Sequence, residues 1–224
     1  MLALRHMLLI VTVVLLIRHA FPDATGNRLY GTTPGIHLSE KGKEQASRLA
    51  ERLAGLKLAA VYSSPFERCM ETTEAIVAGR KLEVRALSDL GEVEYGEWTG
   101  RTFRMLRRTT LWRRVHEVPS SVRFPGGESL EEVRDRGVRA LDSIAARHPR
   151  RAVAAVSHGD VIRLVLAHYA GIHIDLFHRL QADRASVSAV ALGEGAPRVL
   201  RLNDTGTLTD LVPPQQPRPR RVRG

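Results

Sequence analysis

Continuously apolar segments alternate along this chain with segments in which apolar residues recur every three or four positions. Residues 7–17 form the first apolar run, and their Val and Ile content without alternation is typical of a buried parallel strand. The run has the length of a signal-peptide apolar region, but no small-residue cleavage site follows it, and it is too short to span a membrane. Further strands are predicted at residues 58–62, 82–87, 152–156, 186–192 and 198–202, the last two as a hairpin or paired edge strands.

The segments between these strands have the spacing and the boundary signals of helices. Ser39 is a predicted N-cap ahead of apolar positions at helical spacing, and Ser129 with Glu132 matches a capping box. Helices are predicted at residues 39–55, 65–79, 101–116, 129–148 and 160–170. Strands that alternate with helices predict an α/β fold, in which a mostly parallel sheet is covered on both faces.

Chemically capable side chains follow several of the predicted strands. Parallel strands joined by right-handed crossovers end at one edge of a sheet, and ligands of such sheets bind at that edge. The residues that this topology collects there are Arg18, His19, Arg68, Glu92 and His158. Each alone is weak evidence, because a lone histidine at a strand end is more often structural and a lone arginine is more often a surface charge. Together, and in this order, they predict a single site.

The motifs around these residues resemble those of the histidine phosphatase superfamily, the phosphoglycerate-mutase-like group. The resemblance covers residues 8–208 and rests on an ordered set of motifs: LLIRHA at 15–20, LSEKGKEQA at 38–46, YSSPFERCMETTEAI at 62–76, LGEVEYGEWTG at 90–100, PGGES at 125–129 and VSHGDVIR at 156–163. It implies a three-layer α/β/α sandwich with a mostly parallel sheet. It also implies a phosphohistidine intermediate, formed without a metal or another cofactor.

The resemblance implies a role for each residue of this site. His19 is the expected nucleophile, since a neutral imidazole approaches an anionic phosphoester without charge repulsion. Arg18 and Arg68 are expected to clamp the phosphoryl oxygens, which a guanidinium fork fits well. His158 would stabilise charge on the transferring group. Glu92 would protonate the leaving alcohol and then deprotonate the water that hydrolyses phosphohistidine.

The loop after the nucleophile departs from the family pattern. Ala20 stands where the family commonly has glycine, and Thr25 and Asn27 are candidate rather than clearly matched phosphate contacts. Backbone N–H groups at the helix N-terminus that follows Gly159 are a further candidate.

Other side chains near the motifs compete for the same roles. Glu94, Glu97 and Glu128 could supply the acid, although motif position favours Glu92. Cys69 is predicted as a core residue on the apolar side of its helix.

Charge adds two segments to this picture. The chain has 224 residues, a formal net charge of +10 and one cysteine, so it forms no internal disulfide. Six arginines without an acid lie at 101–114, and four lie at 213–224. We predict an N-terminal extension at 1–6, one domain at 7–212 with a capping insert at 98–128, and a disordered basic tail at 213–224. Within the insert, Arg107 and Arg108 are predicted to favour polyanionic substrates.

These features favour a phosphomonoester hydrolase that acts on a small anionic metabolite. The segment from Trp98 to Pro125 is short and the tail is predicted to be disordered, whereas the family's glycolytic mutases have a longer segment and an ordered C-terminal extension. A phosphoglycerate-mutase-type phosphomutase remains an alternative.

Two other classes of function rank lower. A non-catalytic module could bind nucleic acid or an acidic partner through the two basic segments, but the tail has no aromatic residues. A metal-dependent phosphoesterase lacks a second Asp/His cluster to accompany residues 157–160. The expected partner is therefore a small phosphorylated substrate, with nucleic acid and membrane not expected and a homodimer possible. Since the sequence shows no persuasive signal or anchor, we expect a cytoplasmic location.

Overall fold

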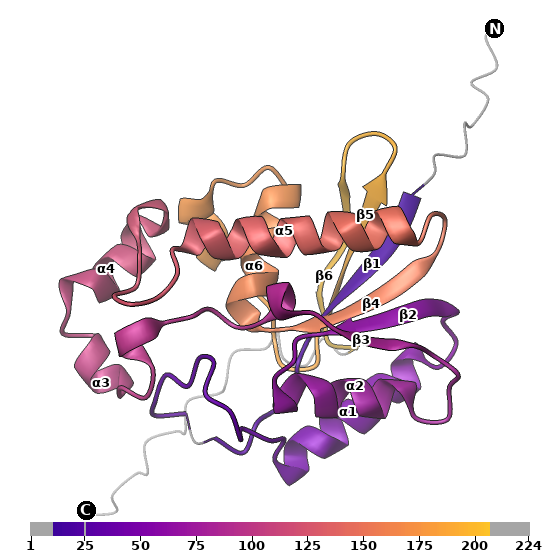
Figure 1. The fold of residues 1–224 in the computed structure, drawn as a ribbon, viewed down its shortest axis with the longest axis horizontal. Helices are drawn as coiled ribbons and strands as arrows, with labels where there is room; N and C mark the ends of the chain where they lie inside the picture. Colours follow the sequence, from indigo (N-terminus) through magenta and orange to yellow (C-terminus); the bar gives the residue numbers. More distant parts are fainter. Residues whose placement is uncertain (1–10, 25, 207–224) are drawn as a thin grey trace, which may run out of the picture.

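The computed structural model describes residues 11–24 and 26–206, and within them it contains one six-stranded sheet (Figure 1). The strands follow the order β3-β2-β4-β1-β5-β6 across the sheet. The first four are parallel, β5 is antiparallel to β1, and β6 is antiparallel to β5. The predicted mostly parallel sheet and the terminal hairpin are confirmed. The strands span β1 Val11–Arg18, β2 Leu58–Ser63, β3 Val84–Ala86, β4 Ala152–Ser157, β5 Val187–Gly193 and β6 Arg198–Asp204.

Helices cover both faces of this sheet. α1 and α2 pack side by side on one face, and α5 and α6 lie together on the other (Figure 1). This arrangement is the predicted α/β/α sandwich. The helices span α1 Glu40–Leu53, α2 Glu67–Val77, α5 Leu130–Arg147 and α6 Gly159–Tyr169.

Strand β1 shows why its run is continuously apolar. Side chains alternate between the faces of a strand, so β1 supplies both layers of the core. Leu15 and Ile17 pack in the cluster that includes α1 and α2, and Val14 and Leu16 pack in the cluster that includes α5 and α6.

The predicted helix starts at Ser39 and Ser129 are confirmed. The Ser39 side chain accepts a hydrogen bond from the backbone N–H of Gly42. Ser129 and Glu132 form the reciprocal capping box, which satisfies two N–H groups that a helix leaves unpaired. These caps fix the starts of α1 and α5, which cover opposite faces of the sheet.

The predicted single helix at 101–116 is wrong. Two short helices occupy this segment, α3 Phe103–Leu106 and α4 Thr110–Glu117. Thr109 separates them, because its hydroxyl donates to Leu106 O at 2.7 Å and accepts from the backbone N–H of Trp112 at 3.1 Å. Such side-chain hydrogen bonds end one helix and begin the next.

The two helices belong to the predicted capping insert, which packs on the side of α5 and α6. Trp98, Leu106 and Phe124 are buried there, and Trp98 stacks on Trp112 with ring centroids 6.2 Å apart. Short 3-10 helices complete the described part of the chain: η1 Ser88–Leu90, η2 Gly96–Trp98, η3 Pro119–Ser121 and η4 Ile174–Arg179.

The predicted extension at 1–6 and tail at 213–224 lie outside the described residues, as do the first four positions of the first apolar run. Among the helices of the described part, none is long and apolar enough to cross a membrane.

Candidate active site

The pairing of β1 with β4 sets the two histidines side by side. Arg18 is opposite Ser157 in the parallel register, and the backbone N–H of His19 donates to Ser157 O at 3.0 Å. The next residue on each strand is a histidine, and the ring centroids of His19 and His158 lie 5.2 Å apart. β2 ends on the other side of β4, where the N–H of Ser64 donates to the carbonyl of the β4 residue before Ser157. The carboxyl ends of three neighbouring strands therefore meet at one point of the sheet edge.

His19 is buried and is held as a neutral imidazole. Its Nδ1 lies 2.8 Å from the carbonyl oxygen of Ala20, an acceptor that requires the ring proton on Nδ1. The lone pair is then on Nε2. Burial lowers the pKa of His19 well below its usual range, and the nearby charges of Arg184 and Arg68 lower it further. The ring therefore offers an uncharged nucleophilic nitrogen at neutral pH.

Two arginines present unpaired donors beside this nitrogen. Arg18 donates from Nη1 to Ala182 O at 2.6 Å, and Arg68 donates from Nη2 to Gly31 O at 2.8 Å. Arg18 Nε and Arg68 Nη1 are buried without a hydrogen-bond partner. Because a buried unpaired donor is costly, these two atoms point to an anionic ligand. Burial also lowers the pKa of Arg18, although a guanidinium remains charged at neutral pH.

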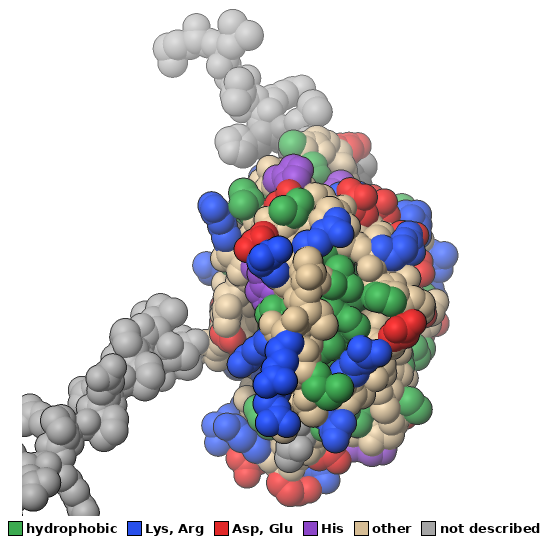
Figure 2. All heavy atoms as spheres, turned by 90° about the vertical axis from the view of Figure 1, so that its left-hand side faces the viewer, with side chains coloured by type: hydrophobic (Ala, Val, Ile, Leu, Met, Phe, Trp, Pro, Cys, Tyr) green, Lys and Arg blue, Asp and Glu red, His purple; other side chains and the backbone are tan. Residues whose placement is uncertain are grey.

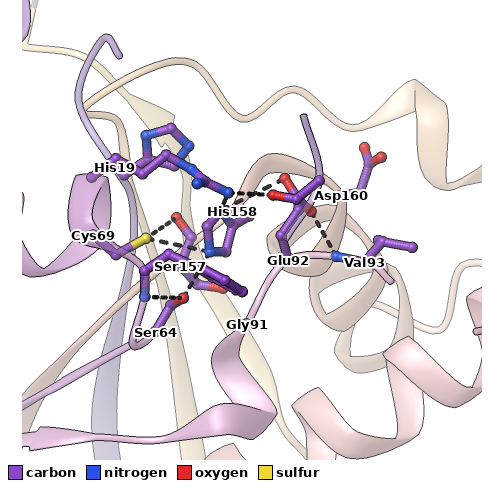
Figure 3. Close-up of polar contacts among 12 residues, drawn as sticks. His19, Ser64, Cys69, Gly91, Glu92, Val93, Ser157, His158 and Asp160 are labelled. Atoms are coloured by element: carbon purple, nitrogen blue, oxygen red, sulfur yellow. Dashed lines mark hydrogen bonds and ion pairs between the residues drawn. The ribbon is translucent and has the colours of Figure 1, made fainter. Parts of the chain in front are cut away.

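His158 is buried between β2, α2 and the loop after β3. Its Nδ1 lies 3.2 Å from Arg68 Nη2, and its Nε2 lies 2.8 Å from Ser64 Oγ and 3.4 Å from Cys69 Sγ. Figure 3 shows His158 with Ser64 and Cys69 on one side and Glu92 on the other. Burial and the charge of Arg68 lower the pKa of His158 well below its usual range. Arg68 therefore donates to Nδ1, and the ring proton lies on Nε2 facing Ser64.

Glu92 reaches the same point from the loop after η1. Its Oε2 lies 3.6 Å from His158 Nδ1, and its Oε1 accepts from the backbone N–H of Val93 at 3.0 Å. Burial raises the pKa of Glu92, and the negative charge of Asp160 raises it further. A carboxyl group in this position holds its proton to higher pH than an exposed one, as a general acid requires.

Arg18, His19, Arg68 and Glu92 line one cavity of about 310 Å³, which we call the His19 cavity. His158 is fully buried behind these residues and is not itself part of the lining. The lining also includes Gly159 at the N-terminus of α6, and a Cβ atom there would lie 2.9 Å from Arg18 Cζ. Glycine at this position therefore leaves room for the Arg18 guanidinium. Among the described residues, no group of three or more His, Cys, Asp or Glu side chains is arranged to hold a metal ion.

The comparisons with known proteins agree with this geometry. The sequence model of the histidine phosphatase superfamily (branch 1) matches residues 14–205. The chain belongs to this superfamily. Phosphoserine phosphatase 1 of Hydrogenobacter thermophilus is 32% identical over 194 residues, which cover 86% of this chain and 92% of that protein.

Solved structures share the fold over nearly the same length. Bacillus stearothermophilus YhfR superposes with a TM-score of 0.81 at 28% identity, covering 86% of this chain and 97% of that one. A putative alpha-ribazole-5'-P phosphatase from Escherichia coli superposes with a TM-score of 0.77 at 25% identity, covering 87% and 97%.

Within this histidine phosphatase, the structure separates Glu92 from the competing acids. Glu128 accepts two hydrogen bonds from Arg136, at 2.7 and 3.0 Å, and does not line the His19 cavity. Glu94 and Glu97 are exposed and also lie outside the lining. Of the four glutamates, Glu92 is the one with access to a ligand in the cavity.

Several predicted binding residues are not brought to the cavity. Arg107 and Arg108 are exposed at the end of α3 and do not line the His19 cavity. Asn27 is also exposed and does not line this cavity. Figure 2 shows the side of the molecule that carries α3 and α4, with Lys and Arg side chains spread over it. Thr25 lies outside the described residues.

Cys69 has the predicted core position. It is fully buried, and burial raises the pKa of its thiol to about 12. The thiolate is therefore scarcely populated at neutral pH, and Cys69 does not act as a nucleophile.

Sequence reasoning missed a second layer of residues around the site. Arg184 contacts His19 from the loop before β5, and the Tyr95 hydroxyl donates to Asp160 Oδ2 at 2.7 Å. Arg163 also forms a hydrogen bond with Asp160. These four residues all line the His19 cavity. Arg184 could have been found only from the sheet topology. A strand that runs antiparallel to β1 begins at the sheet edge where β1 ends, so the residues just before β5 lie near His19.

Proposed function

We propose that this protein is a metal-independent phosphomonoester hydrolase that forms a phosphohistidine intermediate at His19 and acts on a small anionic phosphorylated metabolite. The observation that carries the proposal is the uncharged Nε2 of His19 beside unpaired buried donors of Arg18 and Arg68. A phosphoryl group with about two negative charges would satisfy both donors and lie within reach of the nitrogen.

In the first step, the Nε2 lone pair of His19 attacks phosphorus and the bond to the leaving oxygen breaks. Glu92 gives its proton to that oxygen, so the product leaves as an alcohol. Arg18 and Arg68 balance the charge on the transferring group. The negative charge of the bound phosphoryl group raises the pKa of His158, so His158 takes up a proton from solvent when substrate binds and returns it to solvent when phosphate leaves.

In the second step, water attacks phosphorus on the opposite side of the N–P bond. The ionised Glu92 takes a proton from this water, phosphate leaves, and the lone pair returns to Nε2 of His19. Each residue thus ends in the protonation state in which it began.

The size and lining of the His19 cavity support a small substrate. Its volume of about 310 Å³ is at the low end for ligand pockets. Arg28 and Arg163 line it in addition to the arginines at the phosphoryl position, which favours a metabolite with a second anionic group. Phosphoserine, the substrate in the name of the Hydrogenobacter relative, is one compound of this class.

The test compares hydrolysis of an aryl phosphate in EDTA by the wild type, H19A and H19Q. We expect both variants to lose at least about 1,000-fold in kcat. H168A is the matched control, because His168 is exposed on α6 away from the cavity, and it should keep wild-type activity. Quenched reactions should contain an acid-labile, base-stable phosphate on His19.

The outcomes discriminate between the candidate functions. Undiminished hydrolysis by H19A would exclude His19 as the nucleophile, and loss of wild-type activity in EDTA would exclude the metal-independent mechanism. Interconversion of phosphoglycerate isomers without release of phosphate would identify a phosphomutase.

A further inference from the structure

Arg184 lies directly on the nitrogen that the proposed reaction uses. Its Nη1 is 2.5 Å from Nε2 of His19 and 3.2 Å from Nδ1. The two distances place Nη1 over the face of the imidazole ring beside Nε2, and not along the in-plane lone pair. A phosphoryl group bonded to Nε2 needs the space beside that nitrogen for its oxygens, so the guanidinium has to shift before the N–P bond forms.

The backbone that carries Arg184 is held firmly against β1. Arg18 is the main anchor: its Nη1 donates to Ala182 O at 2.6 Å, its carbonyl accepts from the N–H of Ala185 at 3.1 Å, and its N–H donates to Ser186 O at 3.2 Å. Ala185 has a φ of 56°, in the left-handed region that side chains rarely adopt. The backbone at this point is therefore fixed, and the long Arg184 side chain is the part that can move.

A second anchor holds the other side of this loop. Asn203 of β6 accepts from the backbone N–H of Asp183 at 2.6 Å and donates to the Asp183 carboxylate at 2.7 Å. The acidic neighbour of Arg184 is thus engaged elsewhere. Among the described residues, no carboxylate forms an ion pair with Arg184.

The charges around Arg184 favour an anion as its second partner. Burial and the nearby charges of Arg18 and Arg68 together lower the pKa of Arg184 to about 9, so the side chain still carries its charge at neutral pH. Three guanidinium groups thus converge on one end of the His19 cavity. An anionic group placed against Nε2 of His19 lies within the reach of all three.

We propose that Arg184 is a catalytic residue that exchanges partners during turnover: it covers Nε2 of His19 before substrate binds, and then moves onto the phosphoryl oxygens. This inference rests on the proposed function of the same site. Arg184 stays charged throughout, and its movement neither adds nor removes a proton. When the N–P bond has broken and phosphate has left, the guanidinium returns to its position beside Nε2.

Two measurements that need no turnover test this exchange in R184A and R184Q. The first is the dissociation constant of inorganic phosphate by calorimetry, which we expect to rise about 10- to 100-fold when one charged donor is lost. The second is the rate of acylation of His19 by diethyl pyrocarbonate, followed by mass spectrometry without phosphate. This rate should rise, because the guanidinium no longer occupies the space beside Nε2.

R179A is the matched control, because Arg179 is exposed on η4, five residues earlier in the chain, and does not line the cavity. It should leave both measurements within about 2-fold of the wild type. Unchanged phosphate affinity in R184A and R184Q would overturn the proposal, and so would acylation no faster than in the wild type. Both measurements remain valid if the protein proves not to hydrolyse phosphomonoesters, so the two proposals fail separately.

Discussion

The guanidinium of Arg136 holds the backbone of Glu92 in place. Its Nη2 donates to Glu92 O at 3.0 Å, and its Nη1 donates to Asp89 O at 2.8 Å and Gly91 O at 2.9 Å. Arg136 projects from α5 and is itself fixed by the Glu128 carboxylate. The position of the proposed general acid therefore depends on a side chain of α5 that lies 44 residues further along the sequence.

Replacing Arg136 is expected to impair catalysis more than substrate binding. R136A removes the three hydrogen bonds that fix the Glu92 loop, and an acid misplaced by about 1 Å costs up to about 100-fold in rate. We expect kcat on an alkyl phosphate to fall about 10- to 100-fold. KM should change little, because the residues that contact phosphate are untouched.

R139A is the control for this variant, since Arg139 is exposed one turn further along α5. The first-turnover release of an acidic leaving group from an aryl phosphate is a second control, because its departure needs little protonation and precedes the step in which Glu92 acts as a base. If this first-turnover rate falls as much as kcat on the alkyl phosphate, Arg136 acts on more than Glu92.

Enlarging Gly159 is expected to weaken phosphate binding. A Cβ atom at this position would lie 2.9 Å from Arg18 Cζ and 3.1 Å from Arg18 Nε. The guanidinium has to shift, and the unpaired Nε donor that we propose as a phosphate contact moves with it. We expect G159A to raise KM and the inhibition constant of phosphate about 10-fold. G55A is the matched control, because a Cβ at Gly55 would meet nothing within 4 Å. Unchanged phosphate inhibition in G159A would remove Arg18 Nε from the set of phosphate contacts.

Neutralising Asp160 is expected to move the pH profile to lower pH. The Asp160 charge raises the pKa of Glu92, so D160N lowers that pKa. The proposed acid has to be protonated to act, and its activity is lost as pH rises through its pKa. The basic limb of kcat on an alkyl phosphate should therefore lie at lower pH in D160N than in the wild type.

Asn keeps a side-chain oxygen that accepts from Tyr95, which limits the structural change at this position. D135N, at an exposed carboxylate on α5, should leave the basic limb in place. A basic limb that does not move in D160N would contradict the coupling of Asp160 to Glu92.

The sequence was sufficient for the parts of the site that follow parallel strands. His19, Arg68 and His158 come at or just after strand ends, and one topological rule predicts where such ends meet. Arg184 could not be found in this way, because its position depends on β5 running antiparallel beside β1. The hairpin of β5 and β6 was predicted, but local patterns contain no information about which strand it joins.

The missed helix break has the same physical origin. Residues 101–116 have helical spacing throughout, but Thr109 divides them through two hydrogen bonds of its hydroxyl group. A threonine within a helix looks the same in the sequence whether it caps or only tolerates that position. The break sets the direction of α3 and leaves Arg107 and Arg108 exposed, away from the lining of the His19 cavity.

Removing both Arg107 and Arg108 is expected to slow the association of substrate and to leave the rate of the chemical steps unchanged. Exposed charges outside the cavity act on a substrate only through the long-range field, which is screened over about 10 Å at 0.1 M salt. For the R107A/R108A double variant, we expect kcat within about 2-fold of the wild type at every ionic strength. Its kcat/KM on a dianionic substrate should fall a few-fold at about 10 mM salt and recover at about 0.3 M. The control is R198A/R201A, which removes the same charge from exposed positions of β6. A deficit in kcat/KM that persists at high salt would show instead that Arg107 or Arg108 contacts the substrate directly.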